Sequence, residues 1–155
     1  MNTTIGWREW ISLPELQIPG IKAKIDTGAR TSALHAFFVE PFRQDGIAMV
    51  RFGVHPLRKR EEIELICTAP VKEQRLVTDS GGHRENRFVI ETPIKLGQHL
   101  CPIEITLTNR DTMKFRMLLG RSALQKLEFL VDSSHSYLIG KSLRKEYPPK
   151  KELSA

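Results

Sequence analysis

Apolar and polar residues alternate along much of this chain of 155 residues. Residues 21–25 run apolar, basic, apolar, basic, apolar, which is the two-residue period of a strand with one buried face. The same period returns at residues 48–54, 63–65 and 103–107. A helical face is indicated late in the chain, at residues 122–127. Many short strands and one late helix predict an all-β barrel or sandwich.

Turn residues between these segments predict where the chain reverses. Pro19-Gly20 precedes the strand at 21–25, so a turn is expected there, with a first strand upstream of it. Near the end of the chain, the apolar residues 129–131 and 137–139 flank the polar residues 132–135. That arrangement predicts a hairpin.

A chain of this length is expected to fold as one domain. We assign the barrel to residues 1–140 and a basic C-terminal tail to residues 141–155. The tail contains Pro148-Pro149 and several lysines, but it has no apolar face. We therefore expect the tail to be mobile or loosely docked on the barrel.

The two cysteines and the short apolar runs indicate the cellular compartment in which the protein is expected. Cys67 and Cys101 form neither a Cys-x-x-Cys metal pair nor a disulfide framework, which predicts two buried thiols in a reducing compartment. No apolar run approaches the length of a membrane span, and residues 1–10 lack a signal-peptide pattern. The expected location is the cytoplasm, without a membrane partner.

The net charge is +6, and the basic residues are clustered rather than evenly spread. One cluster is Arg58-Lys59-Arg60, and the other lies within residues 141–151. Either could face an acidic partner, although a solvated loop and a solvated tail are the favoured interpretation. A nucleic-acid partner is not favoured, because the basic residues are not interleaved with aromatic ones and no helix-turn-helix pattern is visible.

The residues that follow the strand at 21–25 are the strongest candidates for chemistry. They read Asp26-Thr27-Gly28-Ala29. Thr27 offers a hydroxyl group, and Gly28 allows another chain to approach closely. An aspartate in a turn commonly caps a neighbouring amide, which would be a purely structural role for Asp26.

This motif resembles the active-site loop of retropepsin-like aspartic proteases, which also follows a hydrophobic strand. Residues 117–124 look like a second landmark of that fold, an apolar strand that runs into Gly-Arg and a short helix. Residues 79–83 look like its glycine-bearing flap hairpin. The resemblance covers about residues 5–140 and implies an all-β, closed acid-protease barrel with one short C-terminal helix.

The longer string from Asp26 to His35 is similar to a bacterial branch of this family, named ATP-dependent zinc proteases or retropepsin-like endopeptidases. Members of that branch are often linked to ATP-grasp ligases that add glutamate to proteins. The resemblance therefore implies an endopeptidase, a peptide or protein substrate that could be acidic or glutamylated, and a functional link to an ATP-grasp ligase.

The resemblance also implies a role for each residue of the candidate site. Asp26 would be the catalytic carboxylate. Because the chain contains one Asp-Thr-Gly, two copies of Asp26 would meet across the axis of a homodimer. The other residues would form the active-site loop (Thr27, Gly28, Ala29), bind substrate from the flap (Ser80, Gly81, Gly82) or support the loop (Gly120, Arg121).

Arg30 departs from the retroviral pattern, in which an acidic or small residue commonly follows the alanine. Its planar guanidinium could bind a carboxylate through two hydrogen bonds. We therefore expect Arg30 to bind substrate and to favour acidic side chains or C-terminal carboxylates.

The family label mentions zinc and ATP, but the residues support neither. The chain has no His-Glu-x-x-His segment, and its five histidines are scattered. No Gly-x-x-x-x-Gly-Lys-Ser/Thr phosphate loop is present. We expect no cofactor and no metal site.

Two other functions are open at this point. A barrel of this kind that binds a peptide or a partner enzyme without cleaving it would have almost the same sequence. A basic nucleic-acid or ribosome-associated module is the less favoured alternative.

Overall fold

The computed structural model describes residues 2–79 and 81–149, and its regular structure is almost entirely β-strand. The first strands are β1 (Thr3–Gly6), β2 (Arg8–Leu13), β3 (Ile18–Ile25), β4 (Ser32–Ala36), β5 (Phe38–Gln44), β6 (Ile47–Val54), β7 (Leu65–Pro70) and β8 (Glu73–Thr78). The later strands are β9 (Arg84–Leu96), β10 (His99–Asn109), β11 (Met117–Leu119) and β12 (Phe129–Asp132). The helices are α1 (Arg121–Lys126) and two short 3-10 turns, η1 (Pro14–Leu16) and η2 (Arg144–Glu146). No helix in this part of the chain is long and apolar enough to cross a membrane.

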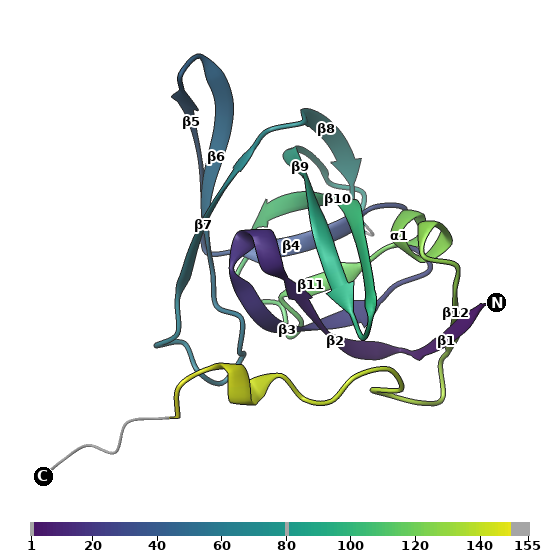
Figure 1. Ribbon diagram of the computed structural model, residues 1–155. Helices are drawn as coiled ribbons and strands as arrows, with labels where there is room; N and C mark the ends of the chain where they lie inside the picture. Colours follow the sequence, from purple (N-terminus) through teal and green to yellow (C-terminus); the bar gives the residue numbers. More distant parts are fainter. Residues whose placement is uncertain (1, 80, 150–155) are drawn as a thin grey trace, which may run out of the picture.

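Six of the strands close into a barrel. Hydrogen bonds join them in the order β10-β4-β11-β3-β2-β9, and β9 pairs again with β10 to close the ring. Strand β8 continues the sheet beyond β9, and α1 lies beside the barrel (Figure 1). The predicted all-β closed barrel with one short helix is confirmed.

The alternation read from the sequence places the apolar side chains inside the barrel. Ile21 and Ala23 of β3 are fully buried, whereas Lys24 beside them is exposed. Leu34 of β4 and Met117 of β11 are also fully buried. Burial of each large aliphatic side chain contributes about 1.5–3 kcal/mol, so this core is what holds β3 and β11 in place.

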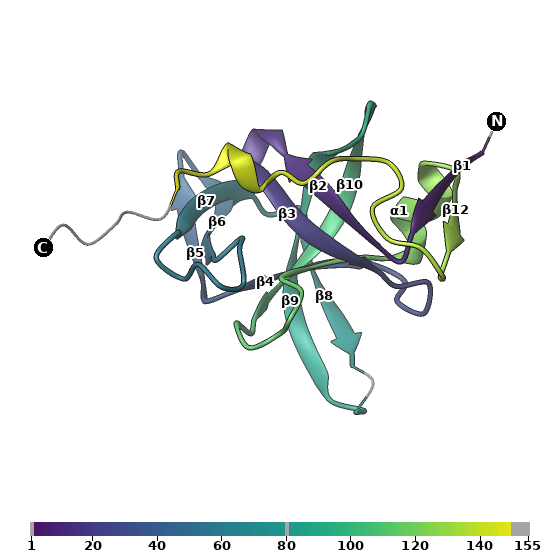
Figure 2. The same ribbon diagram turned by 90° about the horizontal axis from the view of Figure 1, so that it is seen from below.

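Two smaller sheets flank the barrel. Strands β5, β6 and β7 form an antiparallel sheet, and β1 pairs in parallel with β12. The connection between β6 and β7 lies near the C-terminal segment (Figure 2), where Arg60 Nη1 donates a hydrogen bond to the carbonyl of Pro148 at 2.8 Å. The two basic clusters of the sequence therefore lie on the same side of the molecule.

The turn predicted at Pro19-Gly20 is wrong, because both residues lie within β3. The chain reverses earlier, at η1, after which Gln17 has a left-handed conformation with a φ of 58°. The backbone N–H and carbonyl of Gly20 bond to the hydroxyl of Tyr147, at 3.3 and 2.5 Å. A partner 127 residues away thus satisfies the backbone of Gly20 in the strand.

The hairpin predicted from residues 129–131 and 137–139 is also wrong. Strand β12 pairs with β1, and residues 137–139 form no strand. The buried carboxylate of Glu9 accepts hydrogen bonds from the N–H groups of Leu138 and Ile139, at 2.8 and 3.3 Å. In a hairpin, these two N–H groups would have donated to a neighbouring strand. Here the carboxylate of Glu9 accepts their hydrogen bonds instead.

The first part of the C-terminal tail is docked on the barrel rather than loose. Tyr147 is buried in a small cluster with Trp10 and Leu57, and Leu143 packs against that cluster. The boundary after residue 140 stays a prediction. Residues 150–155 lie outside the described residues.

The two cysteines differ in their surroundings. Cys67 is buried and Cys101 is partly exposed, so the expectation of two buried thiols holds for Cys67 alone. Burial raises the pKa of the Cys67 thiol to about 11. Cys67 is therefore an unreactive core residue at neutral pH.

Candidate active site

Asp26 is the first residue after β3, and the barrel fixes its backbone. Strand β3 runs parallel to β11, and the N–H of Asp26 donates to the carbonyl of Leu119 at 2.9 Å. Within the loop, the N–H of Gly28 donates to Asp26 Oδ1 at 2.9 Å. The Asp26 side chain is half-buried. Its carboxylate is therefore oriented by the protein and still reachable from solvent.

The loop after Asp26 is held by the first residues of α1. Arg121 donates through its backbone N–H to the carbonyl of Ala29 at 2.7 Å and through Nη1 to the carbonyl of Thr27 at 3.0 Å. Ser122 donates through its backbone N–H and its hydroxyl to the carbonyl of Arg30, at 3.0 and 2.7 Å. Arg121 Nη1 also donates to the carbonyl of Gly28 at 3.5 Å, so the four carbonyl groups of residues 27–30 all have their donors in residues 121–122.

Gly120 passes too close to this loop to carry a side chain. A Cβ atom on Gly120 would lie 2.6 Å from the carbonyl carbon of Thr31 and 2.9 Å from the nitrogen of Ser32. The N–H of Gly120 donates to Ser32 Oγ at 3.0 Å. Glycine at this position is what lets β11 turn into α1 against the loop.

The remaining loop residues are open to a ligand. Thr27, Gly28 and Arg30 are exposed, and Ala29 is half-buried. Within the described ranges, no ion pair involves the guanidinium of Arg30. Arg30 is therefore available to bind an anionic group.

The predicted flap corresponds to the tip of the hairpin that β8 and β9 form. Asp79 Oδ1 accepts hydrogen bonds from the N–H groups of Gly81 and His83, both at 2.9 Å. These backbone bonds, with the one from His83 the strongest, hold the pKa of Asp79 below its ordinary value. Gly82 has a φ of 83°, in the left-handed region that favours glycine. Ser80, the third expected flap residue, lies outside the described residues.

Arg75 links β8, the strand that leads to the flap, to the active-site loop, and sequence reasoning missed it. Arg75 of β8 donates through Nη1 to the Thr31 hydroxyl at 3.4 Å. Its Nη2 lies 3.4 Å from Glu104 Oε2 on β10. These partners are 44 and 29 residues away along the chain, so no local pattern singled out Arg75 from the other arginines.

His35 of β4 is buried and lies close to several arginines. Its Nδ1 is 2.5 Å from Thr108 Oγ1. Burial, followed by the charges of Arg87, Arg110 and Arg116, lowers the pKa of His35 to about 4. The imidazole is therefore neutral at neutral pH, which suits its positive surroundings.

Metal ligands are not gathered in the part of the chain that the structure describes. No group of three or more His, Cys, Asp and Glu side chains is placed there to hold a metal ion. The zinc of the family label therefore has no matching ligand set among these residues. What the site offers is one carboxylate, that of Asp26, oriented by the N–H of Gly28 and reachable from solvent.

Comparison with known proteins agrees with this geometry. A family model described as the retropepsin-like aspartic endopeptidase RimB matches residues 4–142. The chain belongs to the RimB-like family. The match spans the RimB-like barrel, the Asp26 loop and the turn from β11 into α1, so the resemblance read from the motifs is confirmed.

The relatives of this RimB-like chain include longer proteins. A probable alpha-L-glutamate ligase from Desulfotalea psychrophila is 46% identical over 147 residues, which is 92% of this chain and 32% of that protein. A probable alpha-L-glutamate ligase from Shewanella halifaxensis is 45% identical over 136 residues, which is 88% of this chain and 30% of that protein. The chain thus spans about a third of the length of these curated relatives.

A solved structure resembles the RimB-like barrel. The crystal structure of a Legionella pneumophila protein of unknown function matches 90% of this chain and 100% of the solved chain, with a TM-score of 0.74 and 26% sequence identity. The barrel is therefore the unit that the two proteins share.

Proposed function

We propose that this chain is an aspartic endopeptidase whose active site forms when two copies of it dimerise. Each copy contributes one Asp26 across a two-fold axis. The observation that carries the proposal is the Asp26 carboxylate itself, which is reachable from solvent and oriented by Gly28 in a loop secured by Arg121. Membership of the RimB-like family supports the same class of reaction.

The proposed chemistry needs two carboxylates about 3 Å apart that share one proton, because like charges this close cannot both ionise cheaply. The ionised carboxylate takes a proton from water as the water oxygen attacks the peptide carbonyl carbon. The protonated carboxyl gives its proton to the carbonyl oxygen, which yields a neutral diol. The first carboxyl then protonates the amide nitrogen, the second recovers a proton from the diol, and the C–N bond breaks.

The neighbouring residues support this step in the proposal. The Thr27 hydroxyl bonds across the dimer axis and keeps the two loops at the spacing that the shared proton requires. Gly28 and Ala29 leave room for the substrate beside the carboxylate. The flap at residues 79–83 closes over the peptide and excludes water.

Acidic peptides are the substrates that we propose. The exposed Arg30 can present two parallel N–H donors to a carboxylate. Relatives named probable alpha-L-glutamate ligases contain a segment similar to this chain. This similarity supports a functional link between the chain and an ATP-grasp ligase that adds glutamate. The reducing cytoplasm is the compartment that suits the two free cysteines.

The variant Asp26→Asn tests the proposal, because an amide cannot accept the proton of the attacking water. We expect the wild type to hydrolyse oligoglutamate peptides and Asp26→Asn to be slower by at least about 100-fold. Mass spectrometry of the products measures both rates. Asp45→Asn, a change at an exposed turn between β5 and β6, is the matched control and should keep full activity.

A peptide-binding module without catalysis would give a different result. Such a module would bind the acidic peptide equally well in the wild type and in Asp26→Asn, and neither protein would release products at any pH. Hydrolysis that persists in Asp26→Asn would exclude Asp26 as the catalytic group.

A further inference from the structure

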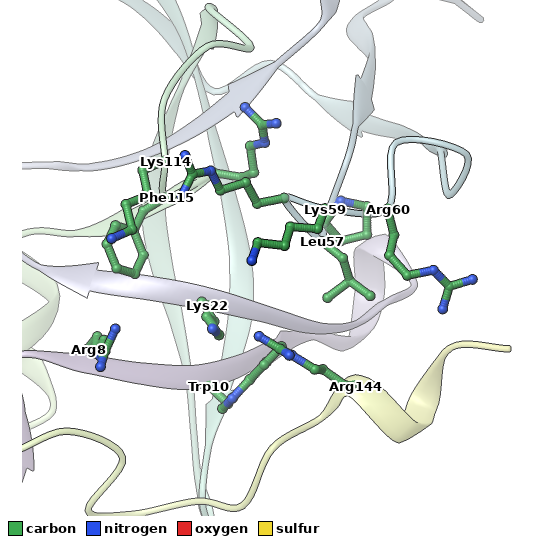
Figure 3. Close-up of a pocket in the computed structure, with 12 residues that line it drawn as sticks. Arg8, Trp10, Lys22, Leu57, Lys59, Arg60, Lys114, Phe115 and Arg144 are labelled. Atoms are coloured by element: carbon green, nitrogen blue, oxygen red, sulfur yellow. The ribbon is translucent and has the colours of Figure 1, made fainter. Parts of the chain in front are cut away.

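A cavity of about 520 Å³ lies where the two basic clusters of the sequence meet. Eight of the twelve described residues that line it are Arg or Lys, and none is Asp or Glu. They come from β2 and β3, from the β6–β7 connection, from the segment before β11 and from the C-terminal tail. Figure 3 shows Lys22 on the strands, with Lys59 and Arg144 reaching toward the same space from the connection and the tail.

Most of the positive charge in this cavity is not neutralised by the protein. Of the Arg and Lys side chains that line it, only Arg60 and Arg116 form ion pairs with carboxylates of the described residues. Burial, followed by the charges of Arg144 and Arg8, lowers the pKa of Lys22. Like charges gathered in a concave site attract an anion and are stabilised by its binding.

The Trp10 ring of the cavity lies beside two of the cations and does not offer a free face. Lys22 Nζ lies 5.5 Å and Arg144 Cζ lies 5.8 Å from the centre of the Trp10 ring, and Trp10 is 4% exposed. Phe115 packs edge-to-face against Trp7, with ring centres 5.9 Å apart. Nucleic-acid sites of this size usually stack bases on open aromatic rings, so the cavity favours carboxylates over nucleotides.

The cavity lies on the strands that lead to Asp26. Lys22 and Lys24 alternate with buried residues, so their side chains leave the outer face of β3, and Asp26 follows directly after this strand. Arg8 of β2 is the register partner of Lys24. At about 3.3 Å per residue, Lys22 and Asp26 are separated by roughly 13 Å. An extended peptide whose scissile bond lies at Asp26 therefore reaches the cavity about four residues away.

We propose that this basic cavity is an additional binding site for the acidic peptide substrate, and that it holds carboxylate side chains about four residues from the bond cleaved at Asp26. The identity of the ligand rests on the proposed endopeptidase function. Lys22, Lys59 and Arg144 bind the carboxylates from three separate segments of the fold. The cavity selects runs of acidic residues, whereas Arg30 alone can select one.

Calorimetric titration of the 155-residue, catalytically silent Asp26→Asn chain with hexaglutamate tests this site. We expect Lys22→Gln and Arg144→Gln, each added to that background, to weaken binding at least about fivefold, since charge-assisted hydrogen bonds are lost. Hexaglutamine should bind weakly to every variant. Two variants on separate elements ensure that a local folding defect in one does not decide the result.

Lys145→Gln is the matched control, because it removes the same charge from an exposed side chain next to Arg144 and outside the cavity. It should weaken hexaglutamate binding less than about twofold. Failure of hexaglutamate to bind, or an equal loss in Lys145→Gln and Arg144→Gln, would overturn the proposal.

Tighter binding of a six-nucleotide oligothymidylate than of hexaglutamate would also overturn it, in favour of a nucleic-acid ligand. A wild type that binds hexaglutamate through Lys22 and Arg144 but hydrolyses no peptide would refute the endopeptidase function alone. The assignment of the cavity to acidic peptides would then stand.

Discussion

At the scale of single residues, the candidate site contains a carboxylate, on Asp26, and a guanidinium, on Arg30. The protein holds the first in place and leaves the second exposed to solvent. The carboxylate of Asp26 is oriented by the N–H of Gly28. The backbone of Arg30 is held by Ser122, while the Arg30 side chain is exposed and has no ion pair within residues 2–79 and 81–149. A fixed backbone with an unpaired guanidinium is the arrangement expected of a residue that binds a ligand.

Changing Arg30 to Gln should therefore alter specificity. We expect kcat/KM for an oligoglutamate peptide to fall about tenfold, the equivalent of one charge-assisted hydrogen bond pair, while kcat/KM for a neutral peptide changes little. Steady-state kinetics on the two peptides measures the ratio. Lys95→Gln, at an exposed position of β9, is the control for loss of one charge. An unchanged preference in Arg30→Gln would remove Arg30 from the substrate site.

At the scale of elements, the site depends on the turn from β11 into α1. This turn gives the loop its hydrogen-bond donors through Arg121 and Ser122, and Gly120 allows the close approach. Strand β8, which leads to the flap, is joined to the same loop through Arg75 and Thr31. The loop, α1 and β8 therefore form one hydrogen-bonded unit next to Asp26.

Gly120→Ala should disturb this unit, because the new Cβ would meet the backbone of the loop. We expect a loss of about 2 kcal/mol or more in the free energy of unfolding. Urea denaturation followed by circular dichroism measures it. Gly140→Ala is the control, since its nearest heavy atom lies 4.0 Å away and its φ is ordinary, and it should change stability by less than about 1 kcal/mol. Equal stability of Gly120→Ala and the wild type would show that the loop can move away at no cost.

The elements that the sequence predicted are those that depend on near neighbours. Alternation located β3, β6 and β10, and the motifs located the loop at Asp26 and a short helix, expected at 122–127 and found at Arg121–Lys126. The errors arose where the decisive partner is distant. Pro19-Gly20 stays in β3 with the help of Tyr147, and residues 137–139 are held by Glu9. Propensity and turn chemistry contain no information about such partners.

The residues of the candidate site also fall into two groups, those that a local motif indicates and those whose partners are distant in the sequence. Asp26 and Gly120 could be singled out because each lies in a recognisable local motif, although the contacts of Gly120 with Thr31 and Ser32 are seen only in the fold. Arg75 could not, because its partners lie on other elements. The basic cavity could not either, since five separate segments must fold together before their charges meet. The sequence alone favoured a solvated loop and tail for residues that line this cavity.

At the scale of the whole molecule, one chain supplies half of the proposed site. A two-fold axis through the Asp26 loops would place one basic cavity on each side of the scissile bond. Acidic residues on both sides of that bond would then be bound, which fits a substrate made of a run of glutamates. The net charge of +6 adds a general attraction for such peptides that weakens as salt is added.

Mixing the wild type with Asp26→Asn is the measurement that tests the shared site most directly. At a fixed total concentration, equal amounts of the two chains are allowed to exchange subunits, and hydrolysis of hexaglutamate is recorded. If each site needs Asp26 from both protomers, about a quarter of the dimers are active, and the rate falls to about a quarter of the wild-type rate. A rate of about one half, in proportion to the wild-type chain present, would contradict a site built from two copies of Asp26.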